Sequence, residues 1–258
     1  ENILKNRRVI AISGTHGKTS TTAMITWMLE SAGLKPGFLI AGNPKDFSVS
    51  ARIGKDEVFV IEADEYDTAF FDKRPKFVHY HPEVLVINNL EFDHADIYSN
   101  LEEIQKQFHN LIRAMPSYGC MICPDNNKNI EQVLELGVWS EVNTFGVHKK
   151  NSNYYEAIKE DYSSIRFHLD NDFEDINWNL TGEYNVSNAM AALLVLNHLN
   201  VPLSSSAKAL ETFSGVSRRL DVLIDRKDLK LIDDFAHHPT AIKETLKGLR
   251  SRYKENRI

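Results

Sequence analysis

The sequence has only two cysteines in 258 residues, and it lacks both an excess of basic residues and a long apolar run. The formal net charge is −6, and the lysines and arginines are scattered, so we expect no nucleic-acid partner. No stretch reaches the roughly 18 consecutive apolar residues of a membrane span, and the apolar run in ENILKNRRVIAIS is too short for a signal peptide. We therefore expect a cytoplasmic protein without a membrane span. The sequence gives no indication of the oligomeric state.

The two cysteines, Cys120 and Cys123, form a CxxC in the apolar run GCMICP, which is typical of a strand. Residues three apart on a strand point to opposite faces. We therefore expect two packed thiols rather than a redox or metal pair.

Short apolar runs alternate with segments of helical period, which predicts an α/β fold with a mostly parallel sheet. Between residues 142 and 178, short tyrosine-rich pieces predict antiparallel strands at one side of the sheet. The other predicted strands are at 9–12, 38–40, 58–61, 84–87 and around Met121, and helices are predicted at 21–32, 101–115, 186–199 and 206–213.

The polar segment after Gly215 indicates a linker, and further elements follow it. Strands are predicted at 222–224 and 229–232, and Pro239 stands at the favoured first position of a helix. Residues 216–258 are close to the size, about 40 residues, below which a domain seldom folds alone. We therefore expect one domain over 1–215, and over 216–258 the start of a further domain of a larger protein.

The segment SGTHGKTS follows the first predicted strand and opens the first helix. It departs from the pattern GxxxxGK[ST], which would need glycine at Ile12. Even so, its glycines allow backbone N–H groups to approach an anion, Lys18 supplies a positive charge and Thr19 a hydroxyl for Mg²⁺. The alternative is a capped helix with a surface lysine. The candidate phosphate-binding residues are Gly14, Thr15, His16, Gly17, Lys18, Thr19 and Ser20.

Ligands of open α/β sheets collect beyond the carboxyl ends of the strands, where two further candidates lie. Glu62 is the first polar residue after the strand at 58–61, and it is either a Mg²⁺ ligand or a solvated strand end. His94 follows the strand at 84–87 among acidic residues, as a second metal ligand, a charge partner or a solvated side chain.

Three later segments carry the remaining candidates. In TGEYNVSN, Asn185 could be a helix N-cap, whereas Asn188 lies one turn further in. In SRRLD, Arg218 and Arg219 could brace a transferring phosphoryl group or be solvated. In LIDDFAHHPTAI, four side chains lie between a strand end and a helix start, where they either face a ligand or belong to a capped helix: Asp233, Asp234, His237 and His238.

These residues alone indicate a Mg-dependent α/β protein that uses ATP or GTP, and they do not name the reaction. Together, however, GTHGKTSTT, EADE, DHAD, GEYNVSNAMAA, FSGVSRRLD and DDFAHHPTAI resemble the motifs of the Mur ligase family in order and character. These are ATP-dependent, ADP-forming amide-bond ligases of peptidoglycan synthesis with three domains. The resemblance implies a central ATPase domain and the start of a Rossmann-like C-terminal domain, without the N-terminal UDP-sugar domain.

The resemblance also implies the substrates. The segment EADEYDTAFFDKRPKFVHYHPEVLVINNLEFDHADIY is most similar to members that join UDP-N-acetylmuramate to the tripeptide L-Ala-γ-D-Glu-meso-diaminopimelate, in peptidoglycan recycling. Members that add L-alanine are the alternative, and they tend to have EADHMD where this chain has EFDHAD. A nucleotide-binding module without ligase activity is a further alternative. The resemblance implies that a substrate carboxylate takes the γ-phosphate of ATP and that an amine then displaces phosphate, so no protein nucleophile is needed.

Site roles follow from the same resemblance. Lys18 grips the β- and γ-phosphates, Thr19 and Glu62 hold one Mg²⁺, and His94 holds a second. Arg219 contacts the γ-phosphate and is, with Lys18 and His94, a catalytic candidate. The remaining implied roles are contacts to adenine and the reaction centre (Tyr184, Asn185, Asn188), to ATP from the third domain (Asp234) and to the incoming amine or peptide (His237, His238).

Overall fold

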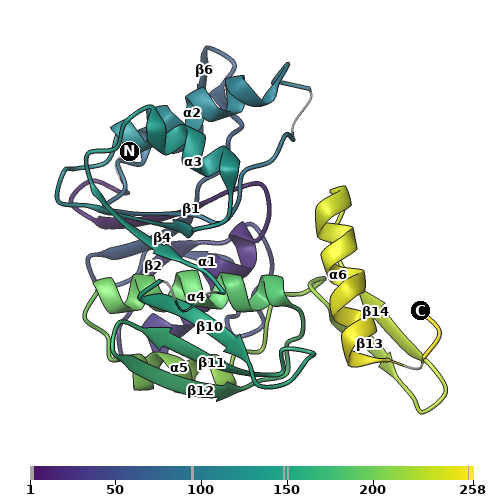
Figure 1. Cartoon of the computed structure of the whole chain (residues 1–258). Coiled ribbons are helices and arrows are strands. Elements are labelled where there is room, and N and C mark those ends of the chain that lie inside the picture. The colour runs from purple at the N-terminus through teal and green to yellow at the C-terminus, as the bar shows by residue number, and fades with distance from the viewer. Residues whose placement is uncertain (1–2, 94–95, 148, 150, 255) are drawn as a thin grey trace.

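The computed structural model describes residues 3–93, 96–147, 149, 151–254 and 256–258. Its centre is a seven-stranded sheet in the order β3-β2-β4-β1-β7-β8-β9 (Figure 1). All neighbouring strands are parallel except β2 and β3. The strands are β1 (Arg8–Ser13), β2 (Gly37–Leu39), β3 (Ala51–Arg52), β4 (Val58–Glu62), β7 (Val84–Ile87), β8 (Cys120–Pro124) and β9 (Glu141–Phe145).

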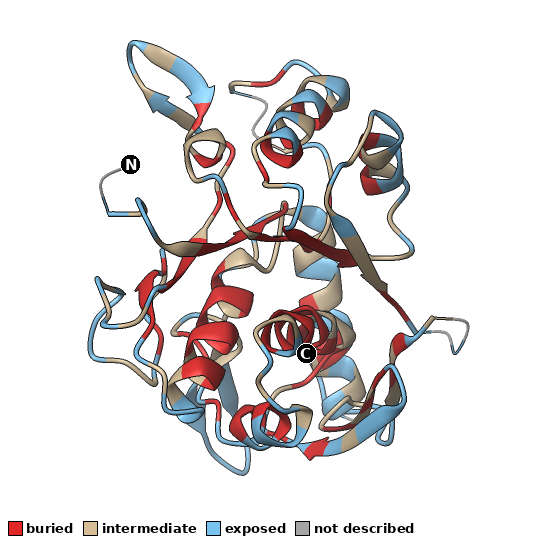
Figure 2. Cartoon of the chain, turned by 90° about the vertical axis from the view of Figure 1, so that its left-hand side faces the viewer, coloured by how far each residue is buried: buried red, intermediate tan, exposed pale blue. Residues whose placement is uncertain are grey.

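Helices cover both faces of this sheet, because its strands are apolar on both sides (Figure 2). Along β1, Val9 and Ala11 belong to one core cluster, and Ile10 and Ile12 belong to the other. One face packs against η1 (Lys76–His79), α2 (Leu101–Arg113) and α3 (Lys128–Glu135), and the other against α1 (Lys18–Ser31), α4 (Glu183–His198) and α5 (Leu203–Glu211).

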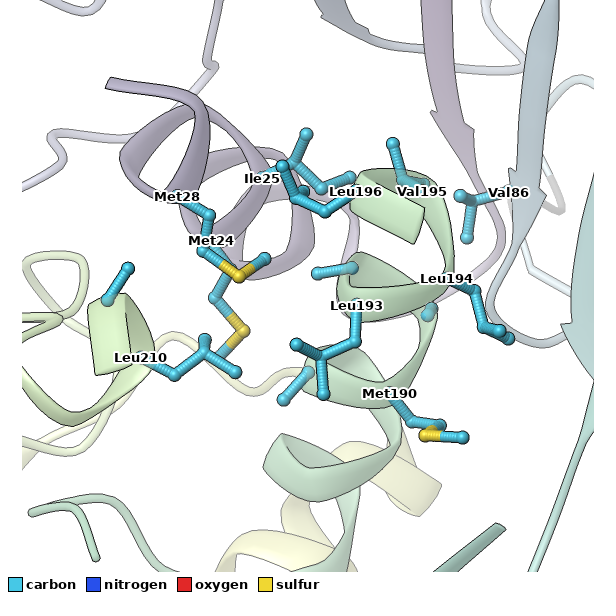
Figure 3. Close-up of a cluster of buried hydrophobic side chains, with 14 of the residues drawn as sticks. Met24, Ile25, Met28, Val86, Met190, Leu193, Leu194, Val195, Leu196 and Leu210 are labelled. Carbon is cyan, nitrogen blue, oxygen red and sulfur yellow. The ribbon is translucent and has the colours of Figure 1, made fainter. Parts of the chain in front are cut away.

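The second core cluster is built where α1, α4 and α5 meet, and Figure 3 shows its side chains. Met24 of α1, Leu193 of α4 and Leu210 of α5 are each at most 1% exposed. Trp27 of α1 donates its indole N–H to the carbonyl of Ala209 at 2.9 Å, which ties α1 to α5. This packing holds α1 in place, and α1 begins at Lys18, directly after the glycine loop that follows β1.

The antiparallel strands predicted between 142 and 178 are confirmed in large part. A three-stranded antiparallel sheet of β10 (Asn153–Ala157), β11 (Ser164–Leu169) and β12 (Asp172–Asn177) packs against α4 and α5. The prediction was wrong for β9, which is the parallel edge strand of the main sheet. The reason is α3, a crossover helix that the sequence reading missed and that a parallel neighbour requires.

The thiols of β8 lie on opposite faces, as predicted: Cys120 belongs to one core cluster and Cys123 to the other. Both are buried and free. The C-terminal elements are also confirmed, with a hairpin of β13 (Asp221–Asp225) and β14 (Lys230–Asp233) followed by α6 (Pro239–Arg252). A further hairpin, β5 (Asp67–Ala69) with β6 (Asp72–Pro75), extends from the α2 side. Within the described residues, no helix is both long and apolar enough to cross a membrane.

Candidate active site

The loop between β1 and α1 is built on two glycines with left-handed backbones, Gly14 (φ 122°) and Gly17 (φ 82°). A Cβ on Gly14 would lie 2.8 Å from the carbonyl oxygen of Asn89, so a side chain has no room there. The loop is fastened to the segment after β7, since the His16 N–H donates to the Asn89 side-chain oxygen at 2.8 Å. The glycines therefore bring the loop backbone close to the segment that follows a neighbouring strand.

Lys18 begins α1 and turns back over the loop. Its Nζ donates to the Gly14 carbonyl at 2.7 Å and lies 3.2 Å from an Asp64 oxygen and 3.4 Å from a Glu65 oxygen. Burial alone would lower the pKa of Lys18, but Glu65 and Asp64 outweigh it and the net shift is upward. The side chain is only 14% exposed and carries its positive charge at the loop, so it is not a surface lysine.

Thr19 and Glu62 meet at the carboxyl end of β4. The Thr19 hydroxyl donates to one Glu62 carboxylate oxygen at 3.1 Å, and the other accepts the Ala41 N–H at 2.7 Å. Burial raises the pKa of Glu62, although both hydrogen bonds and Lys18 oppose that shift. A hydroxyl and a carboxylate at this separation supply the oxygen ligands that Mg²⁺ prefers.

A cavity of about 370 Å³ opens beside the loop, between α4 and the C-terminal segment. Most of the predicted nucleotide contacts outside the lysine and metal positions line it. These are His16, Gly17, Ser20, Tyr184, Asn185, Asn188, Arg219 and Asp234.

Polar groups in this cavity are fixed from several elements. Asp234 accepts the N–H groups of Leu220 at 2.8 Å and Ala236 at 2.9 Å, and the Arg219 guanidinium lies 5.1 Å from the Phe235 ring centre. Among the described residues, the buried Tyr184 hydroxyl has no hydrogen-bond partner. Burial raises the pKa of the Tyr184 hydroxyl, and the negative charge of Asp234 raises it further. A buried hydroxyl without a partner in a cavity wall is suited to a polar ligand.

Other predicted residues lie elsewhere. Five of them lie next to the cavity but outside its lining. Gly14 and Thr15 belong to the loop, Lys18 and Thr19 begin α1, and Glu62 ends β4. His237 is exposed, with its Nδ1 3.0 Å from the Phe235 carbonyl, and it does not line the cavity.

His94 lies outside the described residues, whereas His238 faces the loop, with its ring centre 4.5 Å from that of His16.

The sequence reading missed three residues that the structure brings to the site, Asn88, Asn89 and Glu91. All follow β7 directly in NNLE, and the rule that ligands gather beyond strand ends was enough to find them. Asn88 donates to the Thr21 hydroxyl at 2.9 Å, while its side-chain oxygen is buried without a partner in the described part of the chain. Glu91 accepts the Thr240 hydroxyl at 2.7 Å and so joins this loop to α6.

A glycine loop with a buried lysine, a hydroxyl–carboxylate pair and a cavity at the carboxyl ends of a parallel sheet are features typical of nucleotide-binding α/β proteins. Residues 12–196 match the model of the Mur ligase middle domain, and the chain belongs to the Mur ligase family.

Individual relatives are similar over nearly the whole chain. The UDP-N-acetylmuramate–L-alanyl-γ-D-glutamyl-meso-2,6-diaminoheptandioate ligase of Escherichia coli is 47% identical over 253 residues, which are 97% of this chain and 54% of that protein. The crystal structure of a murein peptide ligase from Psychrobacter arcticus superposes with a TM-score of 0.81 at 40% identity, covering 98% of this chain and 57% of that one. A UDP-N-acetylmuramate–L-alanine ligase of Desulforapulum autotrophicum is 34% identical, over 99% of this chain and 55% of that protein. The chain thus spans about half the length of the curated relatives it matches.

Proposed function

We propose that this chain binds Mg-ATP at the loop of residues 14–20. The observation that carries the proposal is the buried Lys18, held over a glycine loop whose Gly14 has no room for a side chain. Backbone N–H groups and the helix start supply a site for phosphates, and Lys18 adds the charge. Tyr184, Asn185, Asn188, Arg219 and Asp234 then contact the nucleotide from the cavity wall.

We also propose that Mg²⁺ binds beside the loop. Thr19 and Glu62 would hold one Mg²⁺, because their hydroxyl and carboxylate already lie 3.1 Å apart and offer oxygen ligands. His94 is proposed to hold a second Mg²⁺. Bound there, the metal would screen the charge of the phosphates against an incoming carboxylate. The protein's own contribution is to hold these ligands in place before the nucleotide arrives.

For the full-length protein, we propose the ligation of UDP-N-acetylmuramate to L-Ala-γ-D-Glu-meso-diaminopimelate, with ADP and phosphate as products. The carboxylate takes the γ-phosphoryl group and ADP leaves; the amine then attacks the acyl carbon and phosphate leaves. Lys18, His94 and Arg219 are proposed to stabilise the transferring group, and His237 and His238 to face the amine. Residues 1–215 would form the ATPase domain and 216–258 the start of the acceptor domain. The E. coli and P. arcticus relatives, at 47% and 40% identity, support this acceptor over L-alanine, since the L-alanine ligase is 34% identical.

Two experiments test this proposal. Titration calorimetry of this chain with Mg-ATP should show binding that Lys18→Ala abolishes, while Lys208→Ala, which removes an exposed lysine of α5, leaves it unchanged. ADP release by the full-length protein should be stimulated by the tripeptide far more than by L-alanine. Stimulation by L-alanine alone would assign the chain to the alanine-adding ligases, and nucleotide binding without stimulation by either acceptor would leave a binding module.

A further inference from the structure

Two imidazoles and a carboxylate from three separate segments converge beside the phosphate loop. His16 belongs to the loop after β1, Glu91 to the segment after β7, and His238 to the start of α6. One Glu91 carboxylate oxygen lies 3.6 Å from His16 Nε2 and 3.4 Å from His238 Nδ1. The three possible ligand atoms all lie within 4.8 Å of one another.

These separations suit a tetrahedral transition metal. Zinc binds imidazole nitrogen and carboxylate oxygen at about 2.0–2.2 Å, so two ligand atoms of a tetrahedral site lie about 3.3–3.5 Å apart. Both carboxylate-to-imidazole distances are close to that value, and the two imidazole ligand atoms lie within 4.8 Å of each other, on rings whose centres are 4.5 Å apart.

The three ligand atoms make few hydrogen bonds with the surrounding protein. The Nε2 of His16 is buried, and within the described residues it makes no hydrogen bond of normal length, since the Glu91 oxygen that faces it is 3.6 Å away. A bound ligand would satisfy this nitrogen. The Nδ1 of His238 accepts a long hydrogen bond, 3.3 Å, from the Thr240 N–H at the start of α6, and coordination of a metal by this nitrogen would replace that hydrogen bond. The Thr240 hydroxyl donates to Glu91 at 2.7 Å and so orients the carboxylate, as residues around metal ligands commonly do.

We propose that His16, Glu91 and His238 form a binding site for a divalent transition metal of the zinc class, with a fourth position open to water or another donor. Two imidazoles and one carboxylate favour zinc, cobalt or nickel over Mg²⁺, which prefers oxygen ligands. The site is separate from the Thr19 and Glu62 pair, because it shares no ligand with it. A bound metal would fasten the start of α6 to the phosphate loop and thereby restrain the C-terminal segment.

The test is a titration of the untagged chain with Co²⁺, whose visible absorption reports tetrahedral coordination, followed by displacement with Zn²⁺. We expect one intense tetrahedral spectrum at one equivalent. Glu91→Gln should weaken Co²⁺ binding by about tenfold or more, and His238→Asn likewise. Asparagine retains a side-chain acceptor for the helix start, so His238→Asn removes the ligand without removing the cap. The matched control is His237→Asn, which alters the exposed neighbouring histidine and should bind Co²⁺ like the parent chain.

Circular dichroism of each variant establishes that it is folded, and if Glu91→Gln unfolds, the pair of histidine variants decides. Equal Co²⁺ affinity of His238→Asn and His237→Asn would overturn the proposal. So would the absence of a saturable tetrahedral spectrum, or displacement of Co²⁺ by an equal concentration of Mg²⁺. None of these outcomes depends on ATP binding or ligase activity, so the metal site can fail while the proposed function stands, and the reverse.

Discussion

Replacement of Gly14 by alanine should destabilise the chain strongly, because two separate costs add at this position. The backbone has a φ of 122°, which L-residues rarely adopt, at a cost of about 1–3 kcal/mol. The new Cβ would also lie 2.8 Å from the Asn89 carbonyl oxygen, 3.1 Å from the Asn89 nitrogen and 3.2 Å from the Asn88 nitrogen. Backbone atoms cannot rotate away as a side chain can, so overpacking adds about 1–3 kcal/mol.

The sum, about 2–6 kcal/mol, corresponds to a fall in melting temperature of about 5–20 °C for a chain of this size. Differential scanning calorimetry measures it. The matched control is Gly33→Ala: Gly33 also has a positive φ, 87°, but a Cβ there meets nothing within 4 Å. This control should cost only the backbone term, about 1–2 kcal/mol. If the two variants melted at the same temperature, the close approach of Asn89 would have no energetic effect and the packing argument for the loop would be refuted.

Three further predictions concern the buried groups. Burial raises the pKa of the Glu62 carboxyl above its ordinary value of 4.5. Between pH 4.5 and the raised pKa, the native state therefore binds more protons than the unfolded chain. The free energy of unfolding falls as the pH rises through this range. Urea midpoints should accordingly show Glu62→Gln gaining stability relative to the parent chain from pH 4.5 to 7.5, and an unchanged difference would contradict the shift. Burial raises the pKa of Cys123 to about 12 and also raises that of Cys120, so neither thiol should react with a disulfide reagent at pH 8 until urea unfolds the chain; fast labelling of the native chain would argue against this core. Leu193→Ala, at the junction of α1, α4 and α5, should lower the free energy of unfolding by about 2–5 kcal/mol in urea denaturation, and a loss below 1 kcal/mol would show that this junction is loosely packed.

The parallel strands were predictable because burial on both faces makes them continuous apolar runs, and β7 matched its predicted range of 84–87. The helix α3 was not predicted, although its start carries an ordinary signal: the Asn127 side chain accepts the N–H groups of Asn129 and Ile130. It has only eight residues, of which two are buried. A helix that short shows too few turns for its period to stand out, and without it β9 could not be recognised as parallel.

The candidate site, too, could be predicted from the sequence only in part. Residues directly after a strand or in the loop, such as Lys18 and Glu62, were found because position along the chain fixes them at the carboxyl end of the sheet. Asn188 was a candidate because a helix cap did not explain it and because the family resemblance implied a contact there. Contacts between distant segments, such as Glu91 with Thr240, depend on how α6 packs beside the loop and have no local signal in the sequence. His237 and His238 show the limit most clearly: they are adjacent and chemically identical, but one is exposed and the other faces His16.

Asp64 and Glu65, which follow β4, place two carboxylates against Lys18 of the neighbouring loop. Any phosphate that reaches this lysine must compete with two carboxylates already within 3.4 Å. The affinity for a nucleotide is therefore a difference between two ion pairs, and only part of the attraction between lysine and phosphate appears as binding energy. On the proposed function, neutralising either acid should strengthen nucleotide binding and slow nucleotide release.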